Sequence, residues 1–193
     1  MKRALFLSVL AATLLFSFFN FKTALALPVD VTGLCFSPNG GCTRLVVNRI
    51  DQASGSVWVM SYSFTSAPIA KALLRARGRG VDVQVVMDRD EEERQSYEVR
   101  MLIERGVPVY VDREAGIFHD KVMILDGNTV ITGSMNWTKA GEHYNADNLI
   151  VLRSQKLAAY YLKNFQLHKA ASPRVQSVPE RQPGHSKWFL KKW

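Results

Sequence analysis

The sequence has few of the side chains that build metal centres or disulfide frameworks. Its 193 residues include two cysteines and four histidines. Two cysteines cannot complete a tetrahedral zinc site without histidine partners, and no histidine lies near Cys35 or Cys42 in the sequence. The chain also has no internal repeat, which excludes repeat architectures. We therefore expect one domain with a sizeable core and no metal.

The two cysteines flank a turn-rich hexapeptide, Phe-Ser-Pro-Asn-Gly-Gly. Such a segment can bring the Cα atoms of Cys35 and Cys42 within bridging range. An oxidising compartment favours a disulfide over two free thiols, and the beginning of the chain, described below, indicates export. We therefore predict a disulfide between Cys35 and Cys42.

The positive charge lies at the two ends of the chain, although the net charge is +8. Residues 1–26 hold three bases and no acids, and residues 169–193 hold six bases and one acid. Residues 27–168 hold 16 bases and 16 acids and are therefore neutral. The overall charge thus predicts no basic groove on the domain, and any groove must come from the local arrangement of side chains.

The first 26 residues have the pattern of a secretory signal. Met1-Lys2-Arg3 gives a positive start, an apolar run extends from Ala4 to Phe21, and Ala24-Leu25-Ala26 offers a cleavage site after Ala26. The alternative is an uncleaved inner-membrane anchor, since the apolar run is close to spanning length. Both interpretations predict an exported protein, periplasmic or secreted.

The remaining chain divides into a predicted catalytic domain, 27–170, and a basic tail, 171–193. The tail contains three prolines and ends in the basic-aromatic stretch HSKWFLKKW. We predict a flexible tail, which either contacts nucleic acid or membrane or is simply solvated.

Apolar periodicity predicts helices over 44–53, 66–77, 97–105 and 155–168, and strands over 57–63, 81–87, 107–112 and 145–152. Strands and helices alternate at first, and strands cluster later. The predicted fold class is α/β, with a mixed central sheet flanked by helices. The acidic run 88–93 could hold a divalent cation, but we interpret it as a solvated loop and helix start, where acids suit the helix dipole.

A polar motif lies on a predicted hairpin over 119–136, HDKVMILDGNTVITGSMN. In its first strand, alternate residues share one face, beginning with His119 and Lys121. Asp126-Gly127-Asn128 indicates a turn, with Gly127 first in a two-residue turn, and the chain returns through Thr129 to Gly133.

If the turn closes between Asp126 and Thr129, the register of the hairpin follows. Lys121 then faces Ser134, and His119 faces Asn136, with directly opposed Cβ atoms about 5 Å apart. An imidazole, an ammonium, a hydroxyl and an amide would thus form one cluster. The alternative is an ordinary half-buried hairpin whose polar side chains face water.

The motif closely resembles the signature of the phospholipase D superfamily, because His119-x-Lys121 is followed at the expected spacing by Asp126 and by Gly133-Ser134-x-Asn136. The stretches 57–65, 78–88 and 145–151 are similar to those of small, single-motif bacterial endonucleases of the Nuc type. The resemblance covers roughly residues 33–168. It implies a phospholipase D-like half-domain that cleaves phosphodiesters without metal or cofactor.

The resemblance also implies a role for each polar residue. His119 attacks phosphorus and forms a phosphohistidine. Lys121 supplies positive charge, and Ser134 and Asn136 donate hydrogen bonds to the phosphate oxygens. In Nuc-type proteins an acid, usually Glu, orients the histidine, and Asp147 occupies that position here, one methylene shorter.

Asp126 and Gly133 are expected to have structural roles, since Asp126 closes the turn. One histidine cannot be both nucleophile and general acid in the same step. We therefore expect a homodimer whose twofold axis brings two copies of His119 together.

The leading prediction for substrate is DNA or RNA, cleaved with low sequence specificity. The alternatives are phospholipid hydrolysis, of phosphatidylcholine or cardiolipin, and a non-catalytic module that binds nucleic acid or membrane.

Overall fold

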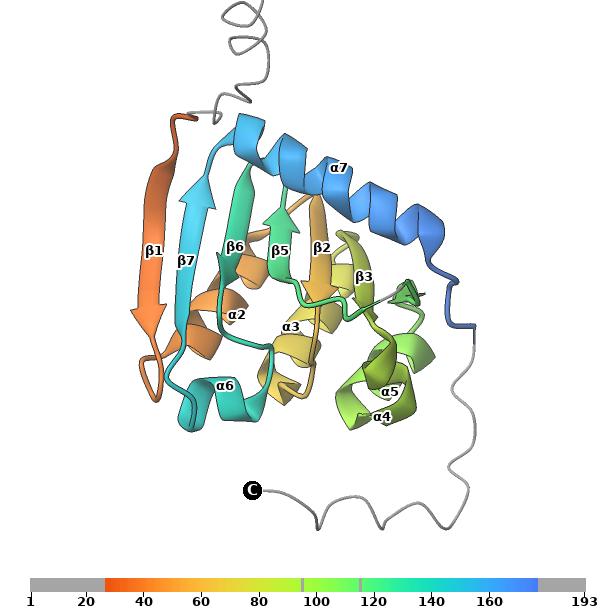
Figure 1. Cartoon of the computed structure of the whole chain (residues 1–193). Helices are drawn as coiled ribbons and strands as arrows, with labels where there is room; N and C mark the ends of the chain where they lie inside the picture. Colours follow the sequence, from red (N-terminus) through yellow and green to blue (C-terminus); the bar gives the residue numbers. More distant parts are fainter. Residues whose placement is uncertain (1–26, 95, 115, 177–193) are drawn as a thin grey trace, which may run out of the picture.

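A computed structural model describes residues 27–94, 96–114 and 116–176, and within them the chain forms a seven-stranded sheet in the order β1-β7-β6-β5-β2-β3-β4 (Figure 1). The strands are β1 (Asp30–Phe36), β2 (Ser56–Ser61), β3 (Asp82–Asp88), β4 (Val109–Asp112), β5 (Lys121–Leu125), β6 (Thr129–Gly133) and β7 (Asn148–Arg153). The helices are α2 (Cys42–Gln52), α3 (Ala67–Gly78), α4 (Arg89–Arg94), α5 (Tyr97–Glu104), α6 (Lys139–His143) and α7 (Gln155–Ala171).

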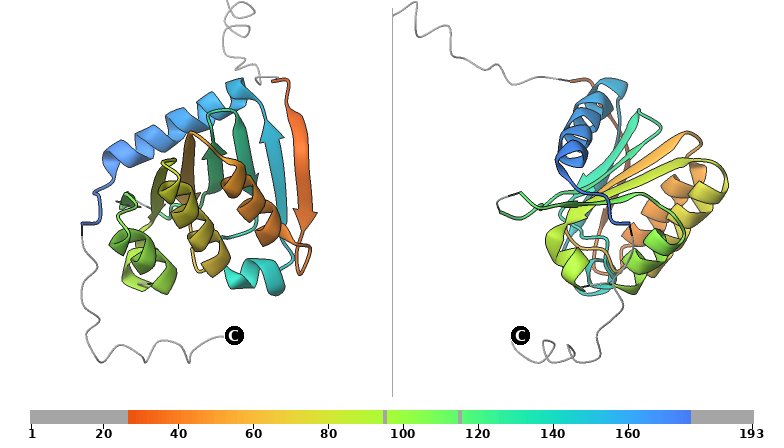
Figure 2. Two further views of the ribbon diagram at one scale, coloured as in Figure 1. Left: turned by 180° about the vertical axis from the view of Figure 1, so that it is seen from behind. Right: turned by 90° about the vertical axis from the view of Figure 1, so that its right-hand side faces the viewer.

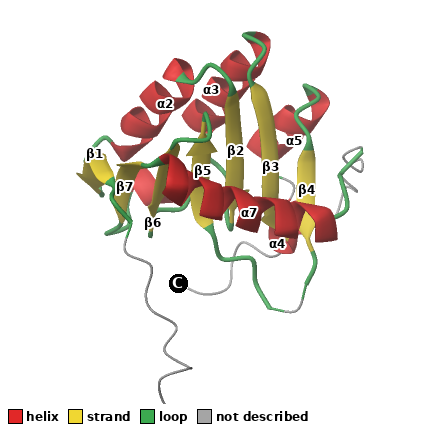
Figure 3. Cartoon of the chain, turned by 90° about the horizontal axis from the view of Figure 1, so that it is seen from above, coloured by secondary structure: helices red, strands yellow, loops and turns green. Residues whose placement is uncertain are grey.

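Helices cover both faces of the sheet. Figures 2 and 3 show α2, α3 and α5 on one face and the long helix α7 lying diagonally across the other. Each layer buries its own core: Ile50 and Leu73 belong to the core beneath α2 and α3, and Phe165 of α7 belongs to the second core. Because the sheet is covered on both sides, all five residues of β5 are buried. The alternative of an ordinary half-buried hairpin is therefore wrong for this strand.

The sheet is mixed. β2, β3 and β4 are parallel, joined by helical crossovers, whereas β5, β6 and β7 follow one another in antiparallel fashion and β5 pairs with β2. The antiparallel order places the beginning of β5, the end of β6 and the beginning of β7 at one end of the sheet, the lower end in Figure 1. The predicted α/β class with a flanked mixed sheet is confirmed.

The predicted hairpin register is wrong by one residue. Leu125, not Asp126, pairs with Thr129, so the turn contains three residues. Asp126 and Gly127 adopt positive φ angles of 50° and 63°. A three-residue turn shifts every pair by one position, which changes the face that each partner presents. The cross-strand pair of Lys121 and Ser134 consequently does not form, and His119 precedes the strand instead of lying within it.

Gly133 permits a close approach between β6 and the beginning of β7. A Cβ atom at this position would collide with the backbone carbonyl of Asn148. That same carbonyl accepts hydrogen bonds from the N–H groups of Ser134 and Met135, at 3.1 and 3.3 Å. The glycine thus lets the chain leave β6 tightly bound to its neighbour.

Two parts of the fold lie outside the sequence predictions. β1 forms an edge strand with a bulge between Val31 and Gly33, and the sequence predicted no strand before the loop between Cys35 and Cys42. Residues 173–175, assigned to the tail, hydrogen-bond with β4 through Pro173 and Val175. The packed part of the chain therefore extends beyond the predicted boundary at 170.

The predicted signal segment and the end of the tail lie outside the described residues. Within the described ranges, no helix combines the length and apolar character needed to cross a bilayer.

Asp126 fastens the hairpin turn to the neighbouring strand. Its carboxylate accepts hydrogen bonds from the backbone N–H groups of Ser54, Gly55 and Ser56, at 3.1, 2.7 and 2.9 Å for the shortest contacts. Burial by itself raises the pKa of Asp126, but the three backbone N–H groups outweigh it and hold the pKa below the ordinary value. The carboxylate therefore lies at the end of β5 opposite to Lys121, where it stabilises the fold.

We predict that Asp126→Asn lowers the free energy of unfolding by about 2 kcal/mol at pH 7, because the backbone donors lose a charged acceptor. The folded pKa lies below the unfolded one. The contribution is therefore fully present above the unfolded pKa, near 3.8, and disappears as the pH falls through the folded pKa. Urea unfolding at pH 7 and at stepwise lower pH measures both effects.

Glu104→Gln is the matched control, because Glu104 makes only an exposed ion pair with Arg100 at 3.9 Å. A loss for Asp126→Asn no larger than for this control would contradict the structural role of Asp126.

Candidate active site

Lys121 is the buried cation at the lower end of the sheet. The residue is 7% exposed, and its Nζ donates a hydrogen bond to the carbonyl of His119 at 2.8 Å. The ammonium also lies 5.1 Å from the centre of the Tyr62 ring. Burial lowers the pKa of Lys121, while the negative charges of Asp120 and Asp147 oppose that shift. The site thus presents a partly desolvated positive charge, which is suited to an anion.

His119 is exposed beside that cation. Its ring packs edge-on against Tyr62, with the two ring centres 4.6 Å apart. The backbone on either side is held, because Phe118 N–H donates to Asp88 at 2.6 Å and Tyr62 N–H donates to the carbonyl of Asp120 at 2.9 Å. The imidazole is therefore positioned by its neighbours and remains open to a ligand.

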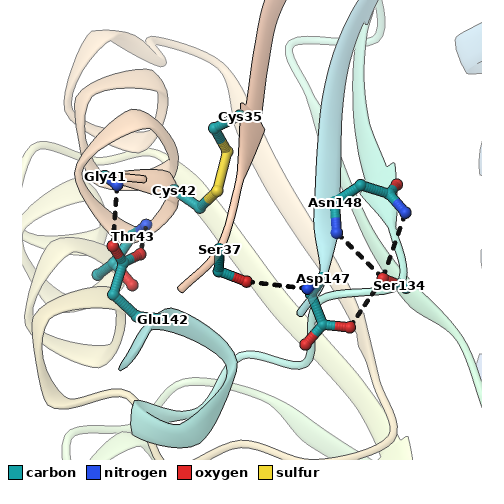
Figure 4. The surroundings of a disulfide bond; sticks show 9 residues. All are labelled: Cys35, Ser37, Gly41, Cys42, Thr43, Ser134, Glu142, Asp147 and Asn148. Carbon is teal, nitrogen blue, oxygen red and sulfur yellow. Dashed lines mark hydrogen bonds between the residues drawn. A yellow bond between two sulfur atoms is a disulfide. The ribbon is translucent and has the colours of Figure 1, made fainter. Parts of the chain in front are cut away.

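Ser134 and Asp147 are hydrogen-bonded to each other. The Ser134 hydroxyl donates to Oδ1 of Asp147 at 2.7 Å and accepts from the backbone and side-chain N–H groups of Asn148 at 3.1 and 3.3 Å (Figure 4). The sequence predicted that Ser134 would donate to phosphate and that Asp147 would bind the imidazole of His119. Within the described residues, the Ser134 proton is directed to Asp147, and no hydrogen bond joins Asp147 to His119.

The acidic group still influences the site through charge. Asp147 lies close enough to Lys121 to raise the pKa of the ammonium, and its second carboxylate oxygen is buried without a hydrogen-bond partner among the described residues. The amide oxygen of Asn136, in the segment after β6, is likewise buried without a partner in that part of the chain. Unsatisfied buried polar atoms are costly, and active sites are where proteins retain them.

The disulfide loop supports this end of the sheet. Cys35 and Cys42 are bonded, with Cα atoms 5.5 Å apart, as the sequence predicted. Inside the loop, Ser37 exchanges two hydrogen bonds with the Asp147 backbone, donating from its N–H at 2.9 Å and accepting at its hydroxyl at 3.2 Å. Figure 4 shows the loop and the Ser134–Asp147 pair side by side. The disulfide therefore constrains the segment that carries Asp147.

Residues 46–169 match the protein family described as "Cardiolipin synthase, PLD-like domain". The chain belongs to this phospholipase D-like family. It is 38% identical over 138 residues to a phospholipase D of Rickettsia conorii, which covers 72% of this chain and 69% of that protein. It is 31% identical over 141 residues to a mitochondrial cardiolipin hydrolase of Drosophila melanogaster, covering 63% of this chain and 56% of that protein.

A solved structure of a phospholipase D family member, Nuc from Salmonella typhimurium, aligns with a TM-score of 0.74 and 37% identity. The alignment covers 78% of this chain and 100% of that chain. Together with the family match, it confirms the resemblance predicted from the motif. The phospholipase D-like chain is a phosphodiesterase, a hydrolase of phosphodiester bonds.

Sequence reasoning missed Tyr62, the aromatic side chain that touches both His119 and Lys121. Tyr62 lies within the predicted strand 57–63 and directly follows the observed β2, but nothing in its sequence neighbourhood marks it as a site residue. The pairing of β2 with β5 is the signal that would have identified Tyr62, because it places the carboxyl end of β2 beside Lys121.

The acidic run 88–93 contains the helix start that the sequence predicted, since α4 begins at Arg89, but two of its acids are not solvated. Asp88 is 1% exposed and Glu91 is fully buried. Asp88 binds the backbone ahead of His119, and Glu91 binds Ser63 and Arg94. Among the residues that the structure describes, no group of three or more His, Cys, Asp or Glu side chains is arranged to hold a metal ion.

We predict that reduction of the Cys35–Cys42 disulfide lowers the free energy of unfolding by about 2.5 kcal/mol, the chain-entropy estimate for so short a loop. Thermal unfolding of the wild-type protein, with and without dithiothreitol, measures the effect. The double variant Cys35→Ala, Cys42→Ala serves as the control, because its unfolding temperature should not respond to the reductant. An equal response of both proteins would show that the reductant acts elsewhere.

Proposed function

We propose that the protein is a metal-independent endonuclease of low sequence specificity that acts through a phosphohistidine. One observation carries the chemistry: the exposed imidazole of His119 and the buried ammonium of Lys121 both lie against the ring of Tyr62, and the ammonium donates to the His119 carbonyl. A phosphodiester is an anion with a poor leaving group. Its cleavage needs a nucleophile, a fixed positive charge and a proton for the departing oxygen.

In the proposed first step, a ring nitrogen of His119 forms a bond to phosphorus and the bond to the leaving oxygen breaks. Lys121 stabilises the charge on the non-bridging oxygens, and the Asn136 amide can donate to them. A second imidazole gives its proton to the leaving oxygen. In the second step this imidazole takes a proton from water, which attacks phosphorus and releases His119 and the phosphomonoester.

Asp147 is proposed to act in this mechanism through charge and through Ser134. Its carboxylate lies near Lys121 and holds the Ser134 hydroxyl, so it helps to keep the ammonium protonated at the pH of the reaction. On substrate binding, the Ser134 hydroxyl and the unpartnered Asp147 oxygen are free to adopt new partners, including phosphate and imidazole.

The choice of nucleic acid as substrate rests on the similarity of the motif and its flanking stretches to Nuc-type endonucleases, and on the alignment with Nuc along its whole length. Exposed aromatic side chains, of Phe36 at the end of β1, Tyr97 at the start of α5 and Tyr144 after α6, offer stacking surfaces for bases. Phospholipid is the second candidate, favoured by relatives named phospholipase D and cardiolipin hydrolase.

We predict that His119→Ala lowers cleavage at least a thousandfold without lowering the unfolding temperature, because the side chain is exposed and packs little. Purified protein is incubated with plasmid DNA, RNA and phosphatidylcholine or cardiolipin vesicles, each with and without EDTA. We expect cleavage of the nucleic acids, unaffected by the chelator.

Cleavage of the lipids alone would show that the protein is a phospholipase and not an endonuclease. Activity that EDTA abolishes and magnesium restores would refute the histidine mechanism, as would His119→Ala retaining a tenth of the wild-type rate.

The second imidazole is proposed to be His119 of a second copy of the chain, related by a twofold axis. Two other histidines near this end of the sheet are held by neighbouring side chains: His143 Nδ1 lies 2.8 Å from Oδ1 of Asn39, and His168 Nδ1 lies 2.7 Å from Oδ2 of Asp112. The protein would also be exported, periplasmic or secreted, as the first 26 residues predict.

In mixed dimers, one wild-type chain and one His119→Ala chain should support no full turnover. With equal amounts of each chain and random pairing, about a quarter of the dimers carry two intact histidines, so activity per total protein should fall to about that fraction. Differently tagged chains and sedimentation establish pairing. A fall only to half would mean that each chain works alone, and His143→Ala and His168→Ala would then test the two alternative acids.

A further inference from the structure

A second charged cluster lies beside the site, on the short helix α4. Glu91 is fully buried, and its Oε1 accepts hydrogen bonds from Ser63 Oγ and from Arg94 Nη1, each at 3.0 Å. Arg94 also lies 3.4 Å from the Ser63 hydroxyl through the same nitrogen. The Ser63 and Glu91 contacts therefore use the same nitrogen of the Arg94 guanidinium, Nη1.

The remaining part of that guanidinium faces solvent. The Arg94 side chain is 49% exposed, whereas the side chain of its partner Glu91 is 0% exposed. Burial raises the pKa of Glu91, and the Ser63 hydroxyl and the Arg94 charge oppose that shift. A buried carboxylate of this kind is rarely the most stable choice for a fold, since apolar replacements of buried ion pairs are often neutral or stabilising. Its effect here is to fix the direction of an exposed cation.

Tyr62 connects this cation to the reacting residues. Its ring lies against both of them, with its centre 4.6 Å from the centre of the His119 ring and 5.1 Å from Lys121 Nζ. Its hydroxyl interacts with Arg94: burial lowers the pKa of that guanidinium, but Glu91 and, to a smaller extent, Tyr62 raise it. Arg94 also contacts Ser63, the residue that follows Tyr62, so the guanidinium lies next to the residue that contacts both His119 and Lys121.

We propose that Arg94 is a second phosphate-binding residue, which takes the phosphodiester adjacent to the one being cleaved. This inference rests on the proposed function and narrows it to substrates with successive phosphodiesters, that is, nucleic-acid strands. Neighbouring phosphates on a strand are separated by one sugar, and here Tyr62 contacts Lys121 while the next residue, Ser63, contacts Arg94. A guanidinium presents paired donors that match two phosphate oxygens, and Glu91 engages only one of its nitrogens.

The experiment compares a substrate that has one phosphodiester with one that has many. Wild-type protein, Arg94→Gln and Arg94→Lys are assayed on bis(4-nitrophenyl) phosphate and on a 20-nucleotide single-stranded DNA. Arg75→Gln is the matched control, because Arg75 is similarly exposed, at 51%, and pairs with Asp51 on the surface of α3. We expect the loss of kcat/KM in Arg94→Gln to be about tenfold larger on DNA than on the small substrate, mainly through KM. Arg94→Lys should recover part of it.

Binding gives a readout that is independent of turnover. In the His119→Ala background, Arg94→Gln should weaken binding of a fluorescein-labelled 20-nucleotide strand, and it should reduce the slope of log K against log salt by about one. Since Arg94→Gln leaves the Glu91 carboxylate buried without its partner, the double variant Glu91→Gln, Arg94→Gln is measured as well. It should show the same selective loss while removing both charges.

The outcomes separate the two proposals. Equal losses on both substrates would show that Arg94 acts on the reacting pair through Tyr62. Unchanged activity on both substrates would show that Arg94 binds no phosphate. Either result overturns the inference about Arg94 and leaves the proposed endonuclease function standing. A wild-type protein that cleaves the small substrate but not DNA or RNA would overturn the endonuclease, and the second phosphate site with it.

Discussion

The burial of one ammonium group, that of Lys121, is the constraint on which this end of the molecule depends. The charge of a lysine that is only 7% exposed must be compensated by its surroundings. The His119 carbonyl, the face of the Tyr62 ring and the negative charges of Asp120 and Asp147 provide this compensation. The compensation is incomplete, because burial still lowers the pKa of the lysine. A phosphodiester anion can supply the negative charge that this ammonium lacks. The burial of Lys121 therefore destabilises the fold and creates the anion-binding site at the same time.

The charged residues of the motif lie at the two ends of one strand, β5. Lys121 begins β5 at the open end of the sheet, and Asp126 follows its last residue, where the carboxylate binds three backbone N–H groups. The four buried residues between them belong to both cores, so the strand is held from either face. A charged residue thus lies at each end of the strand with a different role: Lys121 is proposed to bind phosphate, and Asp126 ties the turn to the start of β2. Asp126 is therefore part of the motif although its carboxylate lies far from His119 and Lys121.

The site is assembled from chain segments that are bound to one another by backbone contacts. The Cys35–Cys42 loop exchanges hydrogen bonds with Asp147, Asp88 binds the residue before His119, and the Asn148 carbonyl binds the chain as it leaves β6. Loops that carry function are usually mobile, but here each of these segments is hydrogen-bonded through its backbone to a neighbouring segment. Such anchoring supports an imidazole that is exposed but positioned, as a nucleophile requires.

Much of the architecture and the family followed from the sequence alone. Apolar periodicity indicated the main helices and strands, and the spacing from His119 to Asn136 indicated the phosphodiesterase family, because those patterns depend on neighbours along the chain. The tertiary structure decided the rest. A one-residue difference in the turn changed the hairpin register, and α7 covered a face that the alternative, half-buried hairpin would have left in water. Glu91 and Asp88 resembled solvated acids until the fold enclosed them, and Tyr62 had no local mark. The physical reason is common to all four: register, burial and cross-strand contact are set by residues distant in sequence, and their energies do not exist until the sheet is assembled.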